Sequence, residues 1–342
     1  MTWLLLLAIT FHAPVRYTSA ADQVVLVHDL NGDGAPELIA SGNQIDERDA
    51  FSLFVNRGDG TFAAEQLLAS NFGERLEDIG DLDGDGIPEL LVSNYWANGI
   101  ATYRGRGALQ FDAAIPLATA THGGPSIING HDIVSLSFGS GNQVRLHLFH
   151  DGIKTTIDTG LANGASMSSR TIDGALELLV AEHSKNLGLI HIANGTVTVS
   201  RIPAGPDFDL ACTFADVNGD GVADIIDTAF DGTIFVTIAQ RQQVASIAGL
   251  PSVVRAADLD RDGHVDLIVN DFQTSTLYAF RGDGAGGFSD AIPIDAGGPV
   301  NNFSIADVNG DGLPDVITAN EDHSISVLIN AGDPPRRRAI RR

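Results

Sequence analysis

Short stretches of alternating apolar and polar residues, each closed by a glycine-rich turn, recur along this 342-residue chain. Alternation with a period of two puts successive side chains on opposite faces, so each stretch predicts a half-buried β-strand. Glycine-rich turns between such stretches are typical of antiparallel hairpins. The seven alternating stretches begin at Phe51, Gly99, Val144, Leu187, Gly232, Ser275 and Ser324.

An acidic residue precedes each alternating stretch and opens a more continuously apolar run, such as residues 37–40. Successive acids lie 42 to 52 residues apart, and a period of this length is typical of repeat architectures. The seven acids are Glu37, Glu89, Asp132, Glu177, Asp224, Asp266 and Asp315. Two independent features of the sequence therefore predict seven repeats.

Each repeat has room for four strands. The first ends before a polar loop, the second begins at the acid, the third is the alternating stretch, and the fourth is an outer strand such as 62–65 or 288–291. Four-stranded sheets repeated around an axis form a β-propeller. We therefore predict an all-β fold over residues 22–332, a seven-bladed β-propeller of four-stranded antiparallel blades.

Five repeats carry the same polar loop between the first two strands, and we call these the acidic loops. They read DLNGDGAPEL from Asp29, DLDGDGIPEL from Asp81, DVNGDGVADI from Asp216, DLDRDGHVDL from Asp258 and DVNGDGLPDV from Asp307. Oxygen-bearing side chains occupy positions 1, 3, 5 and 9, and glycine occupies position 6, which is the pattern of a calcium-binding loop. The backbone carbonyl at position 7 is a natural further ligand.

The convergence of so many carboxylates requires a cation. Two like charges about 4 Å apart repel by about 4 kcal/mol at an effective dielectric near 20. An all-oxygen cage suits Ca²⁺ better than Mg²⁺, which keeps its waters and demands octahedral geometry, whereas zinc prefers Cys or His ligands. We expect about five structural Ca²⁺ ions, one for each loop.

The predicted ligands include the side chains at positions 1, 3, 5 and 9 and the carbonyl at position 7. They are Asp29, Asn31, Asp33, Ala35 and Glu37; Asp81, Asp83, Asp85, Ile87 and Glu89; Asp216, Asn218, Asp220, Val222 and Asp224; Asp258, Asp260, Asp262, His264 and Asp266; and Asp307, Asn309, Asp311, Leu313 and Asp315. The alternative is a set of Asx-Gly turns that satisfy their own backbone without metal. Repeats three and four have lost the loop, so we expect no ion there.

The pattern D-x-[ND]-x-D-G-x-x-[DE], followed by an apolar strand and N-x-G-x-G-x-F, resembles the FG-GAP repeat, also called the VCBS repeat. Residues 56–62, NRGDGTF, show the second half of this pattern. The family is known from integrin alpha-subunit propellers and from secreted bacterial proteins. The resemblance covers about residues 22–332 and implies a calcium-binding propeller with a role in cell adhesion or binding.

The formal net charge of −24 is explained largely by the acidic loops, which hold 17 carboxylates. We therefore interpret the acidity as metal chemistry before any partner signal, and we expect no nucleic-acid partner because like charges repel. Cys212 is the single cysteine, so no intrachain disulfide is possible. Calcium rather than sulfur would stabilise the chain in an oxidising compartment.

The N-terminal segment has two interpretations. Residues 1–20 contain an apolar run and a small-residue site before Ala21, which together resemble a signal peptide, although no Lys or Arg precedes the run. Alternatively, residues 11–17 supply the outer strand that the seventh repeat lacks and close the last blade. Favouring the signal peptide, we expect a secreted, periplasmic or cell-surface protein. Residues 333–342 are predicted to be a disordered basic tail.

Catalytic motifs are sparse. The sequence has no nucleophile elbow, phosphate loop or HExxH motif, so we expect a non-enzymatic protein. Two RGD tripeptides, at 57–59 and 281–283, fit the family's hairpin turn better than an adhesion ligand. His147 and His150 point to opposite faces of one strand, and we expect both in solvated positions. The alternative function is a polysaccharide lyase-like or other carbohydrate-active propeller enzyme.

A binding face is predicted opposite the acidic loops, where the loops between second and third strands and the connections between blades emerge. Exposed aromatic side chains there favour stacking on sugars or contact with a protein loop. For Tyr95 and Trp96 the alternative role is packing between blades. The candidates are Tyr95, Trp96, His183, Lys185, Phe230 and Phe272. We expect a monomer without a membrane span, and a glycan or protein ligand.

Overall fold

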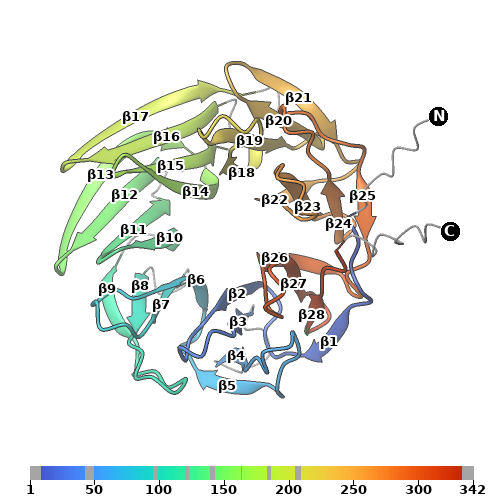
Figure 1. The fold of residues 1–342 in the computed structure, drawn as a ribbon. Helices are drawn as coiled ribbons and strands as arrows, with labels where there is room; N and C mark the ends of the chain where they lie inside the picture. Colours follow the sequence, from blue (N-terminus) through green and yellow to red (C-terminus); the bar gives the residue numbers. More distant parts are fainter. Residues whose placement is uncertain are drawn as a thin grey trace, which may run out of the picture.

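The computed structural model describes residues 9–42, 50–94, 99–119, 123–138, 143–162, 164–182, 186–204 and 209–332. These residues form seven four-stranded antiparallel sheets arranged in a ring (Figure 1). The prediction of a seven-bladed β-propeller is confirmed. Within the described ranges there is no helix with the length and apolarity needed to cross a bilayer.

The strands of each blade follow from the axis outward in chain order. Blade one contains β2 (Val24–His28), β3 (Glu37–Ser41), β4 (Ala50–Phe54) and β5 (Gln66–Ala69). Blade two contains β6 (Glu74–Gly80), β7 (Glu89–Asn94), β8 (Gly99–Tyr103) and β9 (Ile115–Thr119). Blade three contains β10 (Gly123–Asn129), β11 (Asp132–Phe138), β12 (Gln143–His150) and β13 (Ile153–Ala162).

The second half of the chain repeats this order. Blade four contains β14 (Gly164–Ile172), β15 (Ala175–Glu182), β16 (Asn186–Ala193) and β17 (Thr196–Pro203). Blade five contains β18 (Asp209–Ala215), β19 (Asp224–Ala229), β20 (Thr233–Thr237) and β21 (Arg241–Ser246). Blade six contains β22 (Pro251–Ala257), β23 (Asp266–Asp271), β24 (Thr276–Phe280) and β25 (Ile292–Ile294).

Blade seven is assembled from both ends of the chain. It contains β26 (Val300–Ala306), β27 (Asp315–Asn320), β28 (Ser324–Leu328) and, as its outer strand, β1 (Val15–Thr18). The pairing of β1 with β28 runs from Val15 opposite Val327 to Thr18 opposite Ser324. Residues 15–18, which lie within the predicted signal peptide, therefore form a strand of the ring. This is the arrangement in which the N-terminal segment closes the last blade. Residues 1–8 and the predicted tail 333–342 lie outside the described residues.

Hydrophobic packing holds neighbouring blades together. Each of seven buried apolar clusters in the described ranges spans one junction between adjacent blades. At the junction between blades seven and one, for example, Leu38 and Phe54 pack with Ile317 and Val327. The second strands supply much of this core, because β3, β7, β23 and β27 are buried along their whole length.

The outer strands begin further along the chain than predicted. In place of strands at 62–65 and 288–291, the structure has β5 and β25. Phe62 and Phe288 instead form isolated bridges with Asn56 and Gly282. The turn after the third strand is longer than a simple hairpin, and a phenylalanine, buried at Phe62 and partly buried at Phe288, closes it before the outer strand starts.

Candidate metal centres and the opposite face

All five acidic loops join the first strand of a blade to its second, so they lie on one face of the ring. In the first loop the Asp29 carboxylate accepts hydrogen bonds from the N–H groups of Gly32 and Gly34, at 2.8 and 2.9 Å. Gly34 has φ +86, a conformation that side chains with a Cβ rarely adopt. The glycine at position 6 therefore allows the chain to fold back over the first carboxylate.

The acid at position 9 ties each loop to its second strand. One oxygen accepts the N–H of the position-2 residue, for example from Leu82 to Glu89 at 2.7 Å and from Leu259 to Asp266 at 2.8 Å. The same bond occurs at Glu37, Asp224 and Asp315. All five of these acids are at least nine-tenths buried, which fixes the loop against the core.

Burial raises the pKa of every position-9 acid, and the other carboxylates of the same loop raise it further. The pKa values of Asp266 and Asp315 reach about 6. The physical cause is the loss of water together with nearby negative charge. Each loop therefore concentrates negative charge that a cation would neutralise.

Two unpartnered oxygens support a cation in these loops. Glu89 Oε1 and Asp258 Oδ1 are buried and have no hydrogen-bond partner. One carboxylate oxygen from each of Asp81, Asp83 and Glu89 lies within 4.8 Å of the others, and the same holds for Asp258, Asp260 and Asp262. Buried acceptors without donors are costly, and an all-oxygen donor set fits a hard divalent cation such as Ca²⁺.

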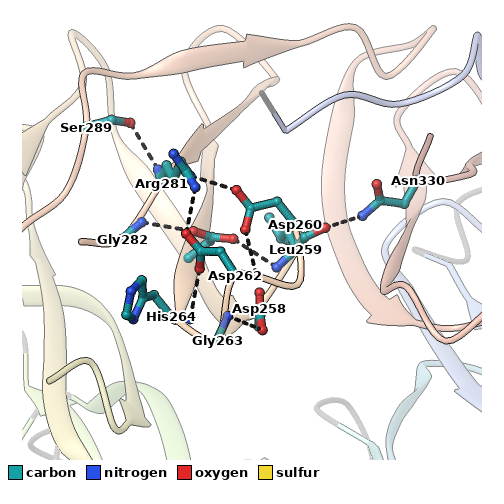
Figure 2. Close-up of polar contacts among 11 residues, drawn as sticks. Asp258, Leu259, Asp260, Asp262, Gly263, His264, Arg281, Gly282, Ser289 and Asn330 are labelled. Carbon is teal, nitrogen blue, oxygen red and sulfur yellow. Dashed lines mark hydrogen bonds and ion pairs between the residues drawn. The ribbon is translucent and has the colours of Figure 1, made fainter. Parts of the chain in front are cut away.

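The five loops fall into two classes according to position 3. Where it is asparagine, its amide donates to the position-5 carboxylate, as from Asn218 Nδ2 to Asp220 Oδ2 at 3.0 Å; Asn31 and Asn309 do the same. Where position 3 is aspartate, an arginine from outside the loop contacts positions 3 and 5. In blade six Arg281 Nε lies 2.6 Å from Asp260 Oδ2 and its Nη2 lies 2.6 Å from Asp262 Oδ2 (Figure 2).

Arg104 plays the same part in blade two, with Nη2 at 2.6 Å from Asp83 and 3.1 Å from Asp85. Both arginines immediately follow the third strand of their blade. The matching residues in the asparagine-type blades are Val55, Ile238 and Ile329. The extra aspartate and the arginine thus occur together, so in both aspartate-type loops an arginine offsets the fourth carboxylate.

A second side chain links neighbouring loops. Asn330 Nδ2 donates to the carbonyl of Leu259 at 2.8 Å (Figure 2) and to the carbonyl of Pro314 in its own blade at 3.0 Å. Asn56 Nδ2 donates to the carbonyls of Val308 and Pro36 in the same way. We call Asn56 and Asn330 the latch asparagines. They join the acidic loops of blades six, seven and one to one another.

A family model for FG-GAP-like repeats matches residues 258–318, which run from the first residue of the blade-six acidic loop into β27. Integrin alpha-4 of Xenopus laevis is 29% identical over 79 residues, covering 20% of this chain. The chain is a β-propeller that carries an FG-GAP-like repeat at these residues. The match spans only 8% of the length of that integrin.

Solved structures match this FG-GAP propeller over almost its whole length. BBS1N in complex with ARL6DN, soaked with mercury, gives a TM-score of 0.63 at 12% identity and covers 96% of this chain and 98% of that chain. The lead-soaked crystal of the same complex gives 0.62 at 12% identity, covering 95% and 98%. Identity this low shows a shared fold alone.

Blades three and four of the FG-GAP propeller replace the acidic loop with a tight hairpin. Asn129 pairs directly with Asp132, and Ile172 pairs directly with Ala175. Two residues remain in each turn, which leaves no loop to surround an ion.

On the opposite face, two of the six predicted ligand-binding residues are described. Phe230 and Phe272 follow the second strands of blades five and six and are 52% and 58% exposed. Tyr95, Trp96, His183 and Lys185 lie outside the described residues. Phe72, 57% exposed in the connection from blade one to blade two, is a further aromatic on this face that the sequence prediction missed. Its exposure on this face was indicated by its position between the outer strand of one blade and the first strand of the next.

The remaining candidates have local roles. The RGD tripeptides serve their own turns: Asp59 Oδ1 accepts the N–H of Thr61, and Asp283 Oδ1 accepts that of Gly287. The expectation for His147 was wrong, because this side chain is buried with Nε2 at 2.6 Å from Ser137 Oγ. His150 is exposed, as expected, and contacts Asp132.

Proposed function

We propose that this FG-GAP propeller is a secreted or cell-surface, non-enzymatic binding module that calcium stabilises and that holds a protein partner on the face opposite its acidic loops. The observation that carries the binding proposal is the set of three phenylalanines on that face, each more than half exposed. Aromatic side chains are enriched in protein interfaces relative to the rest of the surface.

The spacing of these aromatics favours a protein over a glycan. Phe230 and Phe272 lie on adjacent blades, whereas Phe72 lies at the start of blade two, on the far side of the ring. A single sugar contacts one or two rings, whereas a protein interface covers about 800 Å² on each partner. The propeller fold shared with BBS1N, which was solved in complex with ARL6DN, supports this choice.

Calcium has a structural role in this proposal. Cations in the acidic loops would neutralise the converging carboxylates, give partners to the unpaired oxygens of Glu89 and Asp258, and stabilise the folded state through binding linkage. A protein outside the cytoplasm meets enough calcium to fill even weak sites, with dissociation constants on the order of 10⁻⁴ to 10⁻³ M.

The test of the binding proposal uses two exposed phenylalanines and a matched control. The double variant Phe230→Ser/Phe272→Ser should weaken the complex with a partner identified by cross-linking in calcium buffer about tenfold or more. Ile153→Ser, at a side chain 69% exposed on the outer strand of blade three, should leave affinity unchanged. Equal affinity for the double variant and the control would refute the proposed face.

The lyase alternative has its own readout. Elimination on an acidic polysaccharide creates a conjugated double bond whose ultraviolet absorbance grows with time. We expect no such growth from the intact chain in calcium buffer on pectic substrates. Steady turnover, abolished by His183→Ala or Lys185→Ala, would overturn the non-enzymatic proposal.

A further inference from the structure

A cavity of about 480 Å³ follows the axis of the ring. Its wall contains residues from β2, β6, β10, β14, β18, β22 and β26, the first strand of every blade, and Figure 1 shows these strands around the centre. We call this cavity the axial channel. Its volume lies within the range of about 300–1,000 Å³ typical of small-molecule sites.

The wall of the axial channel is rich in hydroxyl groups and contains an unsatisfied acceptor. Ser166, Ser168, Ser169 and Ser252 all line it. Asn302 also lines it, and its Oδ1 atom is buried without a hydrogen-bond partner. An acceptor in this state needs a donor, which a hydroxylated ligand would bring.

Two arginines line the channel: Arg75, which lies near Glu77, and Arg255, which has no such partner among the described residues. Arg255 Nε donates to the carbonyl of Phe303 at 2.8 Å, and its guanidinium lies 5.7 Å from the centre of the Phe303 ring. It lines both the axial channel and a smaller cavity of about 210 Å³ that it shares with His28 and Asp78. These contacts hold the side chain in place and leave its two terminal nitrogens for another partner.

Arg255 has no carboxylate partner among the described residues, and this sets it apart. The other described arginines without one, Arg57, Arg145 and Arg261, are exposed to solvent. Burial lowers the pKa of Arg255, and no opposing charge offsets the effect. Arg255 is only partly exposed, and a guanidinium partly withdrawn from water without a counter-charge is costly.

Two acids, Glu77 and Asp78, belong to the channel wall, and both are already engaged. Glu77 accepts a hydrogen bond from Ser93 Oγ at 2.6 Å and lies 3.7 Å from Arg75. Asp78 accepts the N–H groups of Ile79 and Ile128 at 2.9 and 2.8 Å. Neither pairs with Arg255, so the wall itself does not supply the missing anion.

We propose that the axial channel binds a small hydroxylated organic acid, such as a sugar acid, with its carboxylate on the Arg255 guanidinium. A guanidinium and a carboxylate form paired, charge-assisted hydrogen bonds. The ligand's hydroxyl groups donate to Asn302 Oδ1 and bond the serines. This site is separate from the phenylalanine face, so it stands independently of the proposed protein partner.

Calorimetric titration of the full chain in calcium buffer tests the channel with three probes: D-glucuronate, D-glucose and inorganic phosphate. Glucuronate and glucose share a ring and most hydroxyl groups but differ in the carboxylate. We expect glucuronate to bind at least about tenfold more tightly than glucose, and Arg255→Gln to weaken its binding about tenfold or more. Arg145→Gln, at an exposed arginine of β12, should leave binding unchanged.

A second substitution guards against a folding defect. Asn302→Leu removes the polar acceptor while Arg255 stays, and should weaken glucuronate without creating affinity for glucose; thermal unfolding verifies that both variants fold. Absence of glucuronate binding, equal binding of glucose, or full binding by Arg255→Gln would overturn the proposal. Binding of phosphate alone would also overturn it, because the hydroxyl contacts would then contribute nothing.

Discussion

His147 shows how one buried side chain changes the acid stability of the fold. The imidazole is 4% exposed on β12, with Nδ1 at 3.0 Å from Thr156 Oγ1 and Nε2 near Ser137. Burial, followed by the positive charges of Lys154 and Arg145, lowers its pKa to about 4. The ring is therefore neutral in the folded protein over most of the pH range.

The direction of the pH effect follows from the two states. In the unfolded chain His147 becomes protonated below its usual pKa near 6.5. In the folded chain its pKa is about 4, so the free energy of unfolding falls as the pH falls between these two values. From about pH 7 to about pH 5 the loss due to His147 is about 2 kcal/mol. Measured by urea unfolding over this pH range, the free energy of unfolding of His147→Gln should fall by about 2 kcal/mol less than that of the wild type. An identical pH dependence in the variant would contradict this role.

The arginines after the third strands explain why two acidic loops tolerate a fourth carboxylate. Arg281 is 24% exposed and Asp260 only 4%, so solvent screens their interaction weakly. The guanidinium neutralises outer oxygens at positions 3 and 5, while the position-9 acid faces the core. In the asparagine-type loops the position-3 amide donates a hydrogen bond to the position-5 carboxylate, and an aliphatic residue occupies the position of the arginine.

We expect Arg281→Gln to destabilise the protein by about 2 kcal/mol in chelator and by less in calcium, because the ion replaces part of the lost positive charge. The thermal shift produced by calcium should therefore be larger in the variant than in the wild type. Adding Asp260→Asn recreates the asparagine-type loop and should restore the wild-type shift. Equal losses in chelator and in calcium would show that Arg281 acts by packing alone.

The ring as a whole is closed by the N-terminal strand. Beyond the β1–β28 ladder, the Tyr17 hydroxyl accepts the N–H of Phe62 at 3.0 Å. Its ring meets Phe54 and Phe62 edge-on, with centroids 5.9 Å away in both cases. One strand thus joins the last blade to the first, and its removal would expose an unpaired edge on β28.

Two truncated chains test this closure. A chain that begins at residue 21 loses β1 and should be less stable by about 3 kcal/mol or more, given the aromatic burial that is lost. A chain that begins at residue 9 keeps the strand and should match the full chain. Chemical unfolding compares the three. If the chain starting at residue 21 were as stable as the full chain, the strand would be dispensable and a cleaved leader would be compatible with the ring.

Local patterns were enough to predict the blade number and the loop anatomy, because the acids at position 9 and the alternating strands are periodic features of neighbouring residues. The arginine partners were not predicted. Arg281 looked like part of an RGD turn, and its role depends on the register between β23 and β24. His147 was misplaced for a similar reason, since its burial comes from packing around its strand. Phe72 lies in a connection without periodicity, so the strand pattern alone did not single it out.

The latch asparagine Asn56 gives the junction of blades seven and one a particular property. Asn56 donates to the carbonyl of Val308, and Asp315 accepts the N–H of Val308, so this polar contact between the two blades is built on a loop that calcium would order. Ion loss from that loop would weaken the polar contact, whereas the apolar cluster of Leu38, Phe54, Ile317 and Val327 would stay packed. In a calcium-poor compartment the junction would therefore depend chiefly on its apolar side chains.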